Sequence, residues 1–294
     1  MQAGDYPSEL RDLEWVIFSP FLLASTASPD LRQHNETRDL LSNLHKDPSP
    51  LLAHLQEPKR HTLGSYFEQL VIFWLSHLPS VTVIATNLQI HANGQTLGEM
   101  DLIFNFENKT YHWELSVKFY LNIGNGETET DFVGPLLRDN LGKKLDRLYD
   151  HQLNLPQRTE AQDVLATFAA QNISSFPWVK GMLFQPLDQK IAVSLPTRIS
   201  RNCAIGVWIS FENLTASRLP DFERFIIPEK RSWLTHRHQS EEAQSGGTVA
   251  LSNSVAEKIE VGGRPVLACL LTDTGGPMLE ESLRLFVAPN DWQG

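Results

Sequence analysis

One strongly amphipathic helix followed directly by three strand-like runs constrains the fold of this chain more than any other feature. In residues 62–78, TLGSYFEQLVIFWLSHL, apolar residues recur at helical spacing, and Pro79 ends the pattern. The strand-like runs that follow are at about Val81–His91, Leu97–Phe106 and Thr110–Tyr120. Turn signals at Asn93-Gly94 and Glu107-Asn108 separate these runs. We therefore expect a helix that leads into a β-meander.

The rest of the chain mixes helical and strand-like patterns, so the predicted fold class is α/β. Helices are expected near residues 10–17, at about Arg38–Leu55 and Pro135–Gln152, and from Thr159. Further strands are expected at Gly181–Phe184, Ile205–Phe211, Phe225–Ile227, Val266–Leu271 and Leu283–Val287. The polar, glycine-containing segment 238–253 is interpreted as a mobile loop. We divide the chain into a helical N-terminal lead-in (1–60), a core (61–190) and a C-terminal α/β extension packed on the core (191–294).

Composition and charge restrict the cellular location and the binding partners expected for this chain. The opening MQAGDYPSEL lacks the basic start of a signal peptide, and the most apolar stretch, Leu70–Leu75, is too short to span a bilayer. A cytoplasmic protein without membrane contact is expected. The net charge of −10 argues against a protein that coats nucleic acid, so any nucleic-acid site must be a local patch. Cys203 and Cys269 lie far apart outside any metal-ligand spacing and are expected to be buried free thiols.

Acidic residues and one lysine recur on matching faces of the second and third strands. Alternation in LGEMDLIFNF puts Glu99 and Asp101 on one face, and alternation in YHWELSVKFYL puts Glu114 and Lys118 together. Glu68 lies at the rim of the apolar face of the preceding helix. Carboxylates hold a hard divalent cation that activates water and stabilises phosphate charge, and a lysine helps to position the nucleophile. The pattern therefore matches the needs of phosphodiester hydrolysis.

This arrangement resembles the metal-binding core of the PD-(D/E)xK nuclease superfamily over about Leu63–Tyr120, with GEMDLIF as its most specific part. The resemblance implies a core of a helix, a three-stranded meander, a second helix and a further strand. It also implies a nuclease dependent on Mg²⁺ or Mn²⁺, with Glu68 and Asp101 as metal ligands and Lys118 as the motif lysine. The whole chain, in addition, resembles an uncharacterised bacterial family, domain of unknown function 1853, through its RDLEW-like opening, LGSYFEQL, ELSVKFYL and RSWL segments.

One position departs from the superfamily pattern. Ser116 stands two residues before the lysine, where the superfamily has Asp or Glu. Glu114 lies on the same face about 6.8 Å further along the strand and is the candidate replacement ligand. Two functions follow as hypotheses. The first is a nuclease that cleaves DNA or RNA, with Asp101, Glu114 and Glu68 as ligands; the second is a degenerate module that binds nucleic acid or a protein without cleavage.

Each of these residues also has a purely structural interpretation. Glu68 can be an acid on the solvent-exposed side of its helix, and Glu99 and Asp101 can form the solvent-exposed face of a hairpin. Lys118 can be a lysine that protects an edge strand against aggregation. An unrelated α/β fold is a third alternative. Basic residues that follow the third strand can contact phosphates or form an ordinary solvated face: Arg138, Lys143, Lys144 and Arg147. No dinucleotide, P-loop or serine-hydrolase motif occurs, so no further cofactor is expected, and the sequence leaves the oligomeric state open.

Overall fold

The computed structural model describes residues 6–24, 28–56, 62–168, 170, 172–187, 195–217, 219–238, 242–276 and 278–292. The chain divides into two compact units. Unit 1 comprises residues 1–118 and 144–180, and unit 2 comprises residues 119–143 and 181–294. Strands β3 (Lys109–Asn122) and β5 (Ser174–Pro186) each begin in unit 1 and end in unit 2. The division into three parts that the sequence led us to expect stays a prediction.

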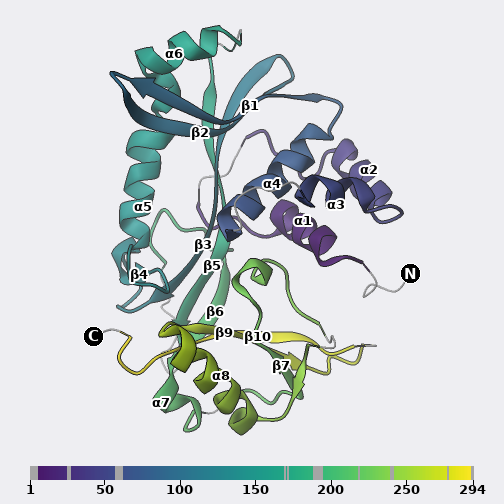
Figure 1. Cartoon of the computed structure of the whole chain (residues 1–294), viewed down its shortest axis with the longest axis vertical. Helices are drawn as coiled ribbons and strands as arrows, with labels where there is room; N and C mark the ends of the chain where they lie inside the picture. Colours follow the sequence, from purple (N-terminus) through teal and green to yellow (C-terminus); the bar gives the residue numbers. More distant parts are fainter. Residues whose placement is uncertain are drawn as a thin grey trace. The chain divides into compact units, whose positions relative to one another are not determined.

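Unit 1 is an α/β structure whose strands lie in the order β1-β2-β3-β5, in agreement with the predicted class. Helices α1 to α4 gather on one side of these strands (Figure 1). Its elements are α1 (Ser8–Phe18), α2 (Asn35–Leu44), α3 (Ser49–Gln56), α4 (Leu63–Ser76), β1 (Val81–Ala92), β2 (Gln95–Phe106), the π-helical turn η2 (Leu148–Gln152), the 3-10 turn η3 (Leu155–Gln157) and α6 (Thr159–Ala166). Helix α5 (Leu141–Arg147) crosses from unit 2 into unit 1.

The three strands of the expected meander form where the sequence predicts them. Two-residue turns join them, and both central residues of each turn have positive φ: Asn93 (50°) and Gly94 (76°) in the first, Glu107 (50°) and Asn108 (59°) in the second. Turns of this handedness match the right-handed twist of paired strands. They fix the pairing of β2 with β3, in which Leu102 lies opposite Trp113.

One face of the unit 1 sheet is covered by aromatic side chains. The ring of Trp113 on β3 stacks on that of Trp178 on β5, with centroids 4.4 Å apart, and it meets the ring of Phe104 on β2 edge-on at 4.9 Å. Trp74 of α4 packs against Trp178 at 5.2 Å. Successive side chains of a strand point to opposite faces of the sheet. The side chains of His112 and of the other even-numbered residues of β3 therefore lie on the face opposite these aromatic rings.

Two helices end or begin differently from the prediction. The helix expected over Arg38–Leu55 is two helices, α2 and α3, and the second begins after Pro48, where the Asp47 side chain accepts a hydrogen bond from the Ser49 backbone N–H (3.0 Å). The helix expected from Pro135 begins only at Leu141. Before it, Leu137 has a φ of 55°, and Asn140 accepts a hydrogen bond from the Lys143 N–H (2.9 Å) as a helix N-cap does.

Unit 2 contains most of the remaining strands, which continue from β5 in the order β5-β6-β10-β9-β7-β8. Its elements are β4 (Phe132–Val133), β6 (Ala204–Ser210), α7 (Phe211–Leu214), β7 (Arg224–Ile226), β8 (Gln244–Ser245), α8 (Thr248–Gly262), β9 (Val266–Thr272) and β10 (Glu280–Ala288). Both cysteines are free and buried, as expected. None of the helices in the described part of the chain has both the length and the apolar character that a membrane span requires.

The prediction of a mobile loop over residues 238–253 is wrong for its second half. Residues 239–241 lie outside the described residues, but α8 begins at Thr248. Leu251 and Val255, four residues apart on α8, are both fully buried in the core of unit 2. Gly263 ends the helix in the left-handed conformation (φ 56°). Only one narrow face of α8 is buried, and the polar composition of the rest of the segment led to its interpretation as a loop.

A buried ion pair within β10 is hydrogen-bonded to the backbone of the segment that contains Trp233 and Thr235. The Arg284 guanidinium donates to both carboxylate oxygens of Glu281 (2.7 and 2.8 Å) and to the backbone carbonyls of Trp233 and Thr235 (2.7 and 2.8 Å). The side chains of Arg284 and Glu281 are only 3% and 1% exposed. Glu281 also accepts a hydrogen bond from the Arg237 N–H (2.8 Å) and lies 3.4 Å from His236 Nδ1. Arg284 nevertheless provides the buried guanidinium that balances the charge of Glu281.

Replacing Arg284 with Met is expected to destabilise the protein by about 3–5 kcal/mol, because Glu281 would remain buried without its cation. The midpoint of urea unfolding measures this loss. The matched control is the exposed Arg264→Met, expected to change stability by less than about 0.5 kcal/mol. Adding Glu281→Leu to Arg284→Met should restore much of the stability, and equal losses in Arg284→Met and Arg264→Met would contradict the interpretation.

Candidate active site

A buried carboxyl, that of Glu114 on β3, lies close to the half-buried carboxyl of Asp101 on β2. The paired region of β2 and β3 runs from Phe106 opposite Lys109 to Leu102 opposite Trp113, and Asp101 and Glu114 are the first residues beyond it on the two strands. Asp101 Oδ2 accepts a hydrogen bond from the backbone N–H of Leu115 (2.8 Å). Glu114 is only 2% exposed. The two acids therefore occupy one face of the hairpin, opposite the face that carries Trp113.

The environment holds both carboxyls largely protonated near neutral pH. Burial and, to a smaller extent, the charges of Glu114, Glu68 and Glu99 together raise the pKa of Asp101 to about 8, against the opposing effect of the Leu115 N–H. Burial likewise raises the pKa of Glu114 to about 8, with Glu99 and Glu68 adding to the rise. Hydrogen bonds from the Asp101 backbone and from Gln152 oppose it. Asp101 and Glu114, together with Glu68 and Glu99, thus form one cluster of four electrostatically interacting acids.

Neutral side chains hold the Glu114 carboxylate at both oxygens. His112 Nε2 lies 2.8 Å from Oε1, and the Gln152 amide donates to Oε2. Burial lowers the pKa of His112 to about 3, so the imidazole is neutral and its contact with Glu114 is a hydrogen bond, not an ion pair. An Nε2–H tautomer satisfies both contacts of the ring, because Nδ1 then accepts from Ser175 Oγ (3.1 Å). The carboxylate is fixed in orientation before any ligand binds.

Gln152 reaches Glu114 because the π-helical turn η2 packs closely against β2. At Gly98 of the GEMD motif a Cβ would lie 3.5 Å from His151 Nε2 of η2 and 2.9 Å from Leu155 Cδ2 of η3. His151 Nε2 also lies 2.9 Å from the Leu97 carbonyl oxygen, a distance at which it donates a hydrogen bond. A side chain at position 98 would displace the end of Leu155, so glycine favours this packing of η2 and η3 against β2.

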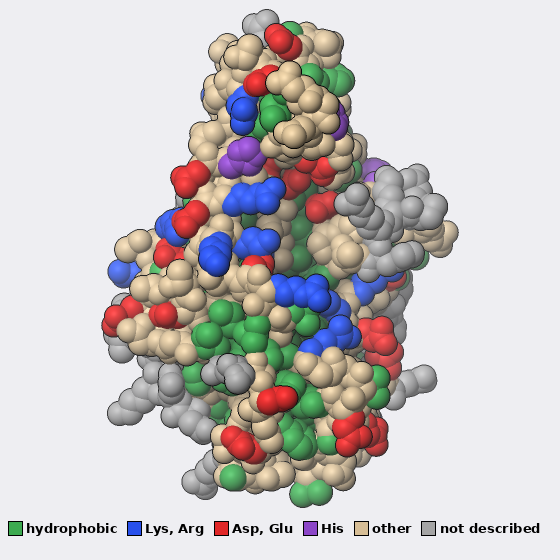
Figure 2. All heavy atoms as spheres, turned by 60° about the vertical axis from the view of Figure 1, so that its left-hand side comes forward, with side chains coloured by type: hydrophobic (Ala, Val, Ile, Leu, Met, Phe, Trp, Pro, Cys, Tyr) green, Lys and Arg blue, Asp and Glu red, His purple; other side chains and the backbone are tan. Residues whose placement is uncertain are grey.

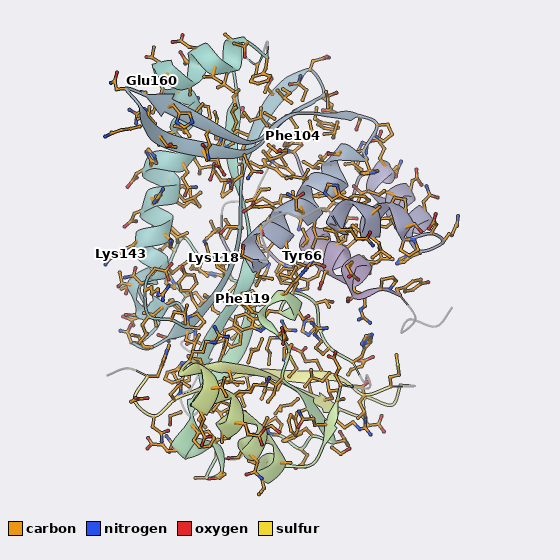
Figure 3. All side chains as sticks on the ribbon, in the orientation of Figure 1. Tyr66, Phe104, Lys118, Phe119, Lys143 and Glu160 are labelled. Carbon is orange, nitrogen blue, oxygen red and sulfur yellow. The ribbon has the colours of Figure 1, made fainter. Side chains whose placement is uncertain are left out.

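The other residues of the predicted site lie around this pair. Glu68 on α4 and Lys118 on β3 are both partly exposed. Lys118 has the same strand parity as Glu114, so it lies on the same face of β3. Figure 3 labels Lys118, the last residue of its segment of unit 1, and Phe119, the first residue of unit 2. Glu99 is held by the side-chain amides of Asn87 (3.3 Å) and Gln89 (3.0 Å) on β1.

The four basic residues proposed to contact phosphates are all exposed but do not form one element. Lys144 and Arg147 lie on the part of α5 that belongs to unit 1, and Lys143 lies on the part that belongs to unit 2. Arg138 precedes the helix, contrary to the expectation that a helix from Pro135 carries all four. Figure 2 shows a face on which Lys and Arg side chains lie among Asp and Glu side chains. Their role in binding nucleic acid stays a prediction.

The carboxyl groups of this site provide some, but not all, of the oxygen ligands that a hard divalent cation requires. Mg²⁺ is commonly bound through one or two carboxylates, keeps several waters and receives further oxygens from substrate phosphates. Asp101 and Glu114 provide two such carboxylates on facing strands. Within the described ranges, no three His, Cys, Asp or Glu side chains are arranged as a metal-binding group. The residues present therefore fit a site of two carboxylates completed by a substrate better than a site made of protein ligands alone.

His112, Gln152 and Ser175 are parts of this site to which the sequence assigned no role. His112 shares the polar face of the third strand, so its position was visible from alternation, although its bond to Glu114 was not. Gln152 lies 38 residues beyond Glu114 and has no motif around it. Ser175 lies on β5, which the sequence predicted only from Gly181 onward.

Stability should depend on pH through the acid pair. A carboxyl whose folded pKa exceeds its unfolded value near 4 binds its proton more tightly in the native state. The stability it contributes is full below pH 4 and is lost as the pH rises through about 8, the pKa of Asp101 and Glu114. In EDTA, ionisation of this pair is expected to lower the melting temperature as the pH rises from about 5 to about 8.

Replacing Asp101 with Asn should raise the melting temperature at about pH 8 and flatten this dependence, because a buried charge is removed. One pKa unit corresponds to about 1.4 kcal/mol and each kcal/mol to about 2–4 °C, so a rise of several degrees is expected. The exposed Asp163→Asn on α6 is the control and should leave the profile unchanged. A lower melting temperature for Asp101→Asn at pH 8 would contradict the raised pKa.

The fold and site together define a mixed α/β protein with a buried carboxylate pair on a β-hairpin. Residues 11–288 match the family described as a domain of unknown function (DUF1853), so the chain belongs to that family, as the sequence led us to expect. No curated protein and no solved structure matches the chain.

Proposed function

We propose that this protein is a divalent-metal-dependent nuclease that hydrolyses phosphodiester bonds in DNA or RNA, built on a PD-(D/E)xK-like core. The observation that carries the proposal is the buried Asp101–Glu114 pair on facing strands. Two neighbouring carboxyls whose pKa values are raised by burial and by nearby acids form a site that a divalent cation stabilises in the ionised state. Bound there, Mg²⁺ or Mn²⁺ would supply an activated water and stabilise phosphate charge.

The residues around the pair have distinct roles in this proposal. Asp101 and Glu114 hold the cation, and the partly exposed Glu68 adds negative charge to the same site. Lys118, on the same strand face as Glu114, provides the positive charge beside the attacking water or the scissile phosphate. His112 and Gln152 keep the Glu114 carboxylate in one orientation, as partners of ligating carboxylates commonly do.

A second function is favoured by a different observation. Both oxygens of Glu114 already take part in hydrogen bonds, one with His112 and one with Gln152, and Ser116 replaces the acid usual in the superfamily. A pair held this way can persist as a protonated, structural remnant of a nuclease site. The chain would then be a degenerate module that binds nucleic acid or a protein partner without cleavage.

Cleavage assays separate the two functions. The purified chain is incubated with end-labelled single-stranded, duplex and branched DNA and with RNA, in Mg²⁺, in Mn²⁺ or in EDTA. The nuclease proposal requires products from at least one substrate with a divalent ion and none in EDTA. Salt-dependent binding without any product would favour the degenerate module. Absence of both cleavage and binding would remove nucleic acid as the partner.

A further inference from the structure

Unit 2 contains a pocket that the proposed chemistry does not use. Its volume is about 360 Å³, which is within the range of sites for small ligands. The pocket lies where the end of α8 leads into β9, next to the segment that follows β7 (Figure 1). Aliphatic residues and prolines from four segments give it an apolar lining, among them Pro135, Leu136, Ile227, Pro228, Val261 and Val266.

The charged residues of this pocket are mainly cations. Lys230 lies on the 3-10 turn η4 (Lys230–Ser232), Lys258 lies on α8, and Arg264 lies between α8 and β9. All three are exposed, and within the described ranges none of them forms an ion pair with a carboxylate. Glu229 is the one acid of the lining. The pocket therefore has an excess of positive charge in a chain whose net charge is −10.

Cationic and apolar groups meet on one side of α8. Lys258, Val261 and Gly262 occupy positions i, i+3 and i+4, so they share one face of the helix. The Val261 side chain is 92% exposed. A Cβ at Gly262 would lie 3.5 Å from Arg264 Nε, so the Arg264 side chain folds back over the last turn of α8. There it balances the negative end of the helix dipole.

The lining offers little for the recognition of neutral polar groups. No Ser, Thr, Asn, Gln, Tyr or His is among the described residues that line the pocket. The Trp233 Nε1–H donates to the Pro228 carbonyl (3.3 Å), and the indole is only 8% exposed because Phe119 and Phe286 meet it in edge-to-face contacts. Sugars and nucleobases need neutral hydrogen-bonding partners or a free aromatic face. The pocket therefore selects a ligand by its apolar shape and its charge.

We propose that this pocket binds a small aliphatic monocarboxylate, with its hydrocarbon chain on the apolar lining and its carboxylate among the three cations. Glu229 and the C-terminal end of α8 add negative charge beside the cations, so a single charge suits the site better than the double charge of a phosphate monoester. The inference is independent of the proposed nuclease, because every residue that carries it belongs to unit 2.

Calorimetric titration at pH 7 in EDTA tests the chemistry of the ligand. Sodium octanoate is compared with butanoate, octylammonium and octyl phosphate. Burial of methylene groups is expected to make the Kd for octanoate about 10- to 200-fold lower than that for butanoate. Octylammonium, which has the same chain and the opposite charge, should bind at least about fivefold more weakly than octanoate. No binding of octanoate up to about 10 mM, or tighter binding of octylammonium or octyl phosphate, would overturn the proposal.

Two surface variants test the residues, each with a matched control in unit 2. Lys258→Glu should raise the Kd for octanoate at least about fivefold, and Leu136→Ala at least about threefold. Arg201→Glu makes the same change of charge at an exposed position outside the pocket, and Leu137→Ala removes an exposed leucine that does not line it. Both controls should leave the Kd unchanged. Circular dichroism melting confirms folding, and wild-type Kd values in both pocket variants would refute the assignment.

An anionic bilayer presents the same combination of acyl chain and negative charge as a free acid. Cosedimentation with vesicles of equal parts phosphatidylglycerol and phosphatidylcholine distinguishes the two sources. The proposal expects octanoate to bind and expects no sedimentation that depends on Lys258. Sedimentation that is lost in Lys258→Glu, without binding of octanoate, would replace the free acid with a membrane surface. Asp101→Asn should bind octanoate with the wild-type Kd, so failure of the nuclease proposal leaves this result unaffected.

Discussion

Replacing Asp101 with Asn is expected to lower divalent-dependent cleavage by about 100- to 1,000-fold, the range seen when one preorganised charge-stabilising group of an active site is lost. Asn keeps the size of the side chain and can still accept the Leu115 N–H, so the hairpin should remain folded. What it removes is the negative charge that the cation requires. The rate of cleavage of the preferred substrate at fixed Mg²⁺ measures the loss.

Stability measurements distinguish this loss from unfolding. Because the Asp101 pKa is raised to about 8, Asp101→Asn should melt at or above the wild-type temperature in EDTA at pH 8. In wild type, Mn²⁺ should raise the melting temperature by mass action, about 2.7 kcal/mol at an ion concentration one hundred times Kd, and the variant should lose that rise. An inactive but more stable variant without a Mn²⁺ response would identify Asp101 as a ligand; an unchanged response would locate the metal elsewhere.

Lys118→Ala provides a parallel test with a different outcome. The lysine is expected to act on the water or the phosphate, not on the ion, so cleavage should fall while the Mn²⁺ response of the melting temperature remains. The exposed Lys109→Ala at the start of β3 serves as the control for loss of a surface cation. Equal activity in Lys118→Ala and wild type would contradict the role of Lys118.

The helix and meander of unit 1 could be predicted because every local signal agrees there. Pro79 follows the amphipathic helix, and the two turns have Asn-Gly and Glu-Asn at positions that need positive φ. Alternation then fixes which residues share a face, once the register is set by the turns. Asp101 and Glu114 became candidates for one site by this logic alone.

The remaining features depend on tertiary contacts that leave little local signal. Helix α8 was hidden by a polar sequence, because Leu251 and Val255 are sufficient to bury its narrow face. Gln152 reaches Glu114 because η2 packs against β2, where His151 contacts the Leu97 carbonyl oxygen 54 residues away in sequence. The pKa of the acid pair could not be predicted either, because it depends on burial by these distant segments.

The position of Ser116 leads to the second large expected effect. Glu114 faces Asp101 across the hairpin, whereas the superfamily's usual acid position is occupied by Ser116, two residues further along β3. If Glu114 has taken over the ligand role, Glu114→Ala should lower cleavage by about 100-fold or more. It also leaves His112 and Gln152 without their acceptor, so part of any loss of stability will come from these two buried donors.

Ser116→Glu separates a migrated ligand from a structural acid. Ser116 is partly exposed and has the same parity as Glu114, so a glutamate there points to the same face of β3. In wild type the substitution should maintain or raise cleavage, and in the Glu114→Ala background it should restore part of it. Two residues that compete for one ion give such a non-additive result, measurable as a double-mutant cycle on kcat/KM.

Ser116→Gln is the matched control, because it has the size of glutamate without the charge. It should not rescue Glu114→Ala, and a rescue by Gln would mean that packing, not metal ligation, limits the variant. If Ser116→Glu fails to rescue while the double variant is folded and binds single strands in EDTA, Glu114 is not a migrated ligand. The degenerate module would then account better for a carboxyl group that is buried, has a raised pKa and is hydrogen-bonded to two neutral side chains.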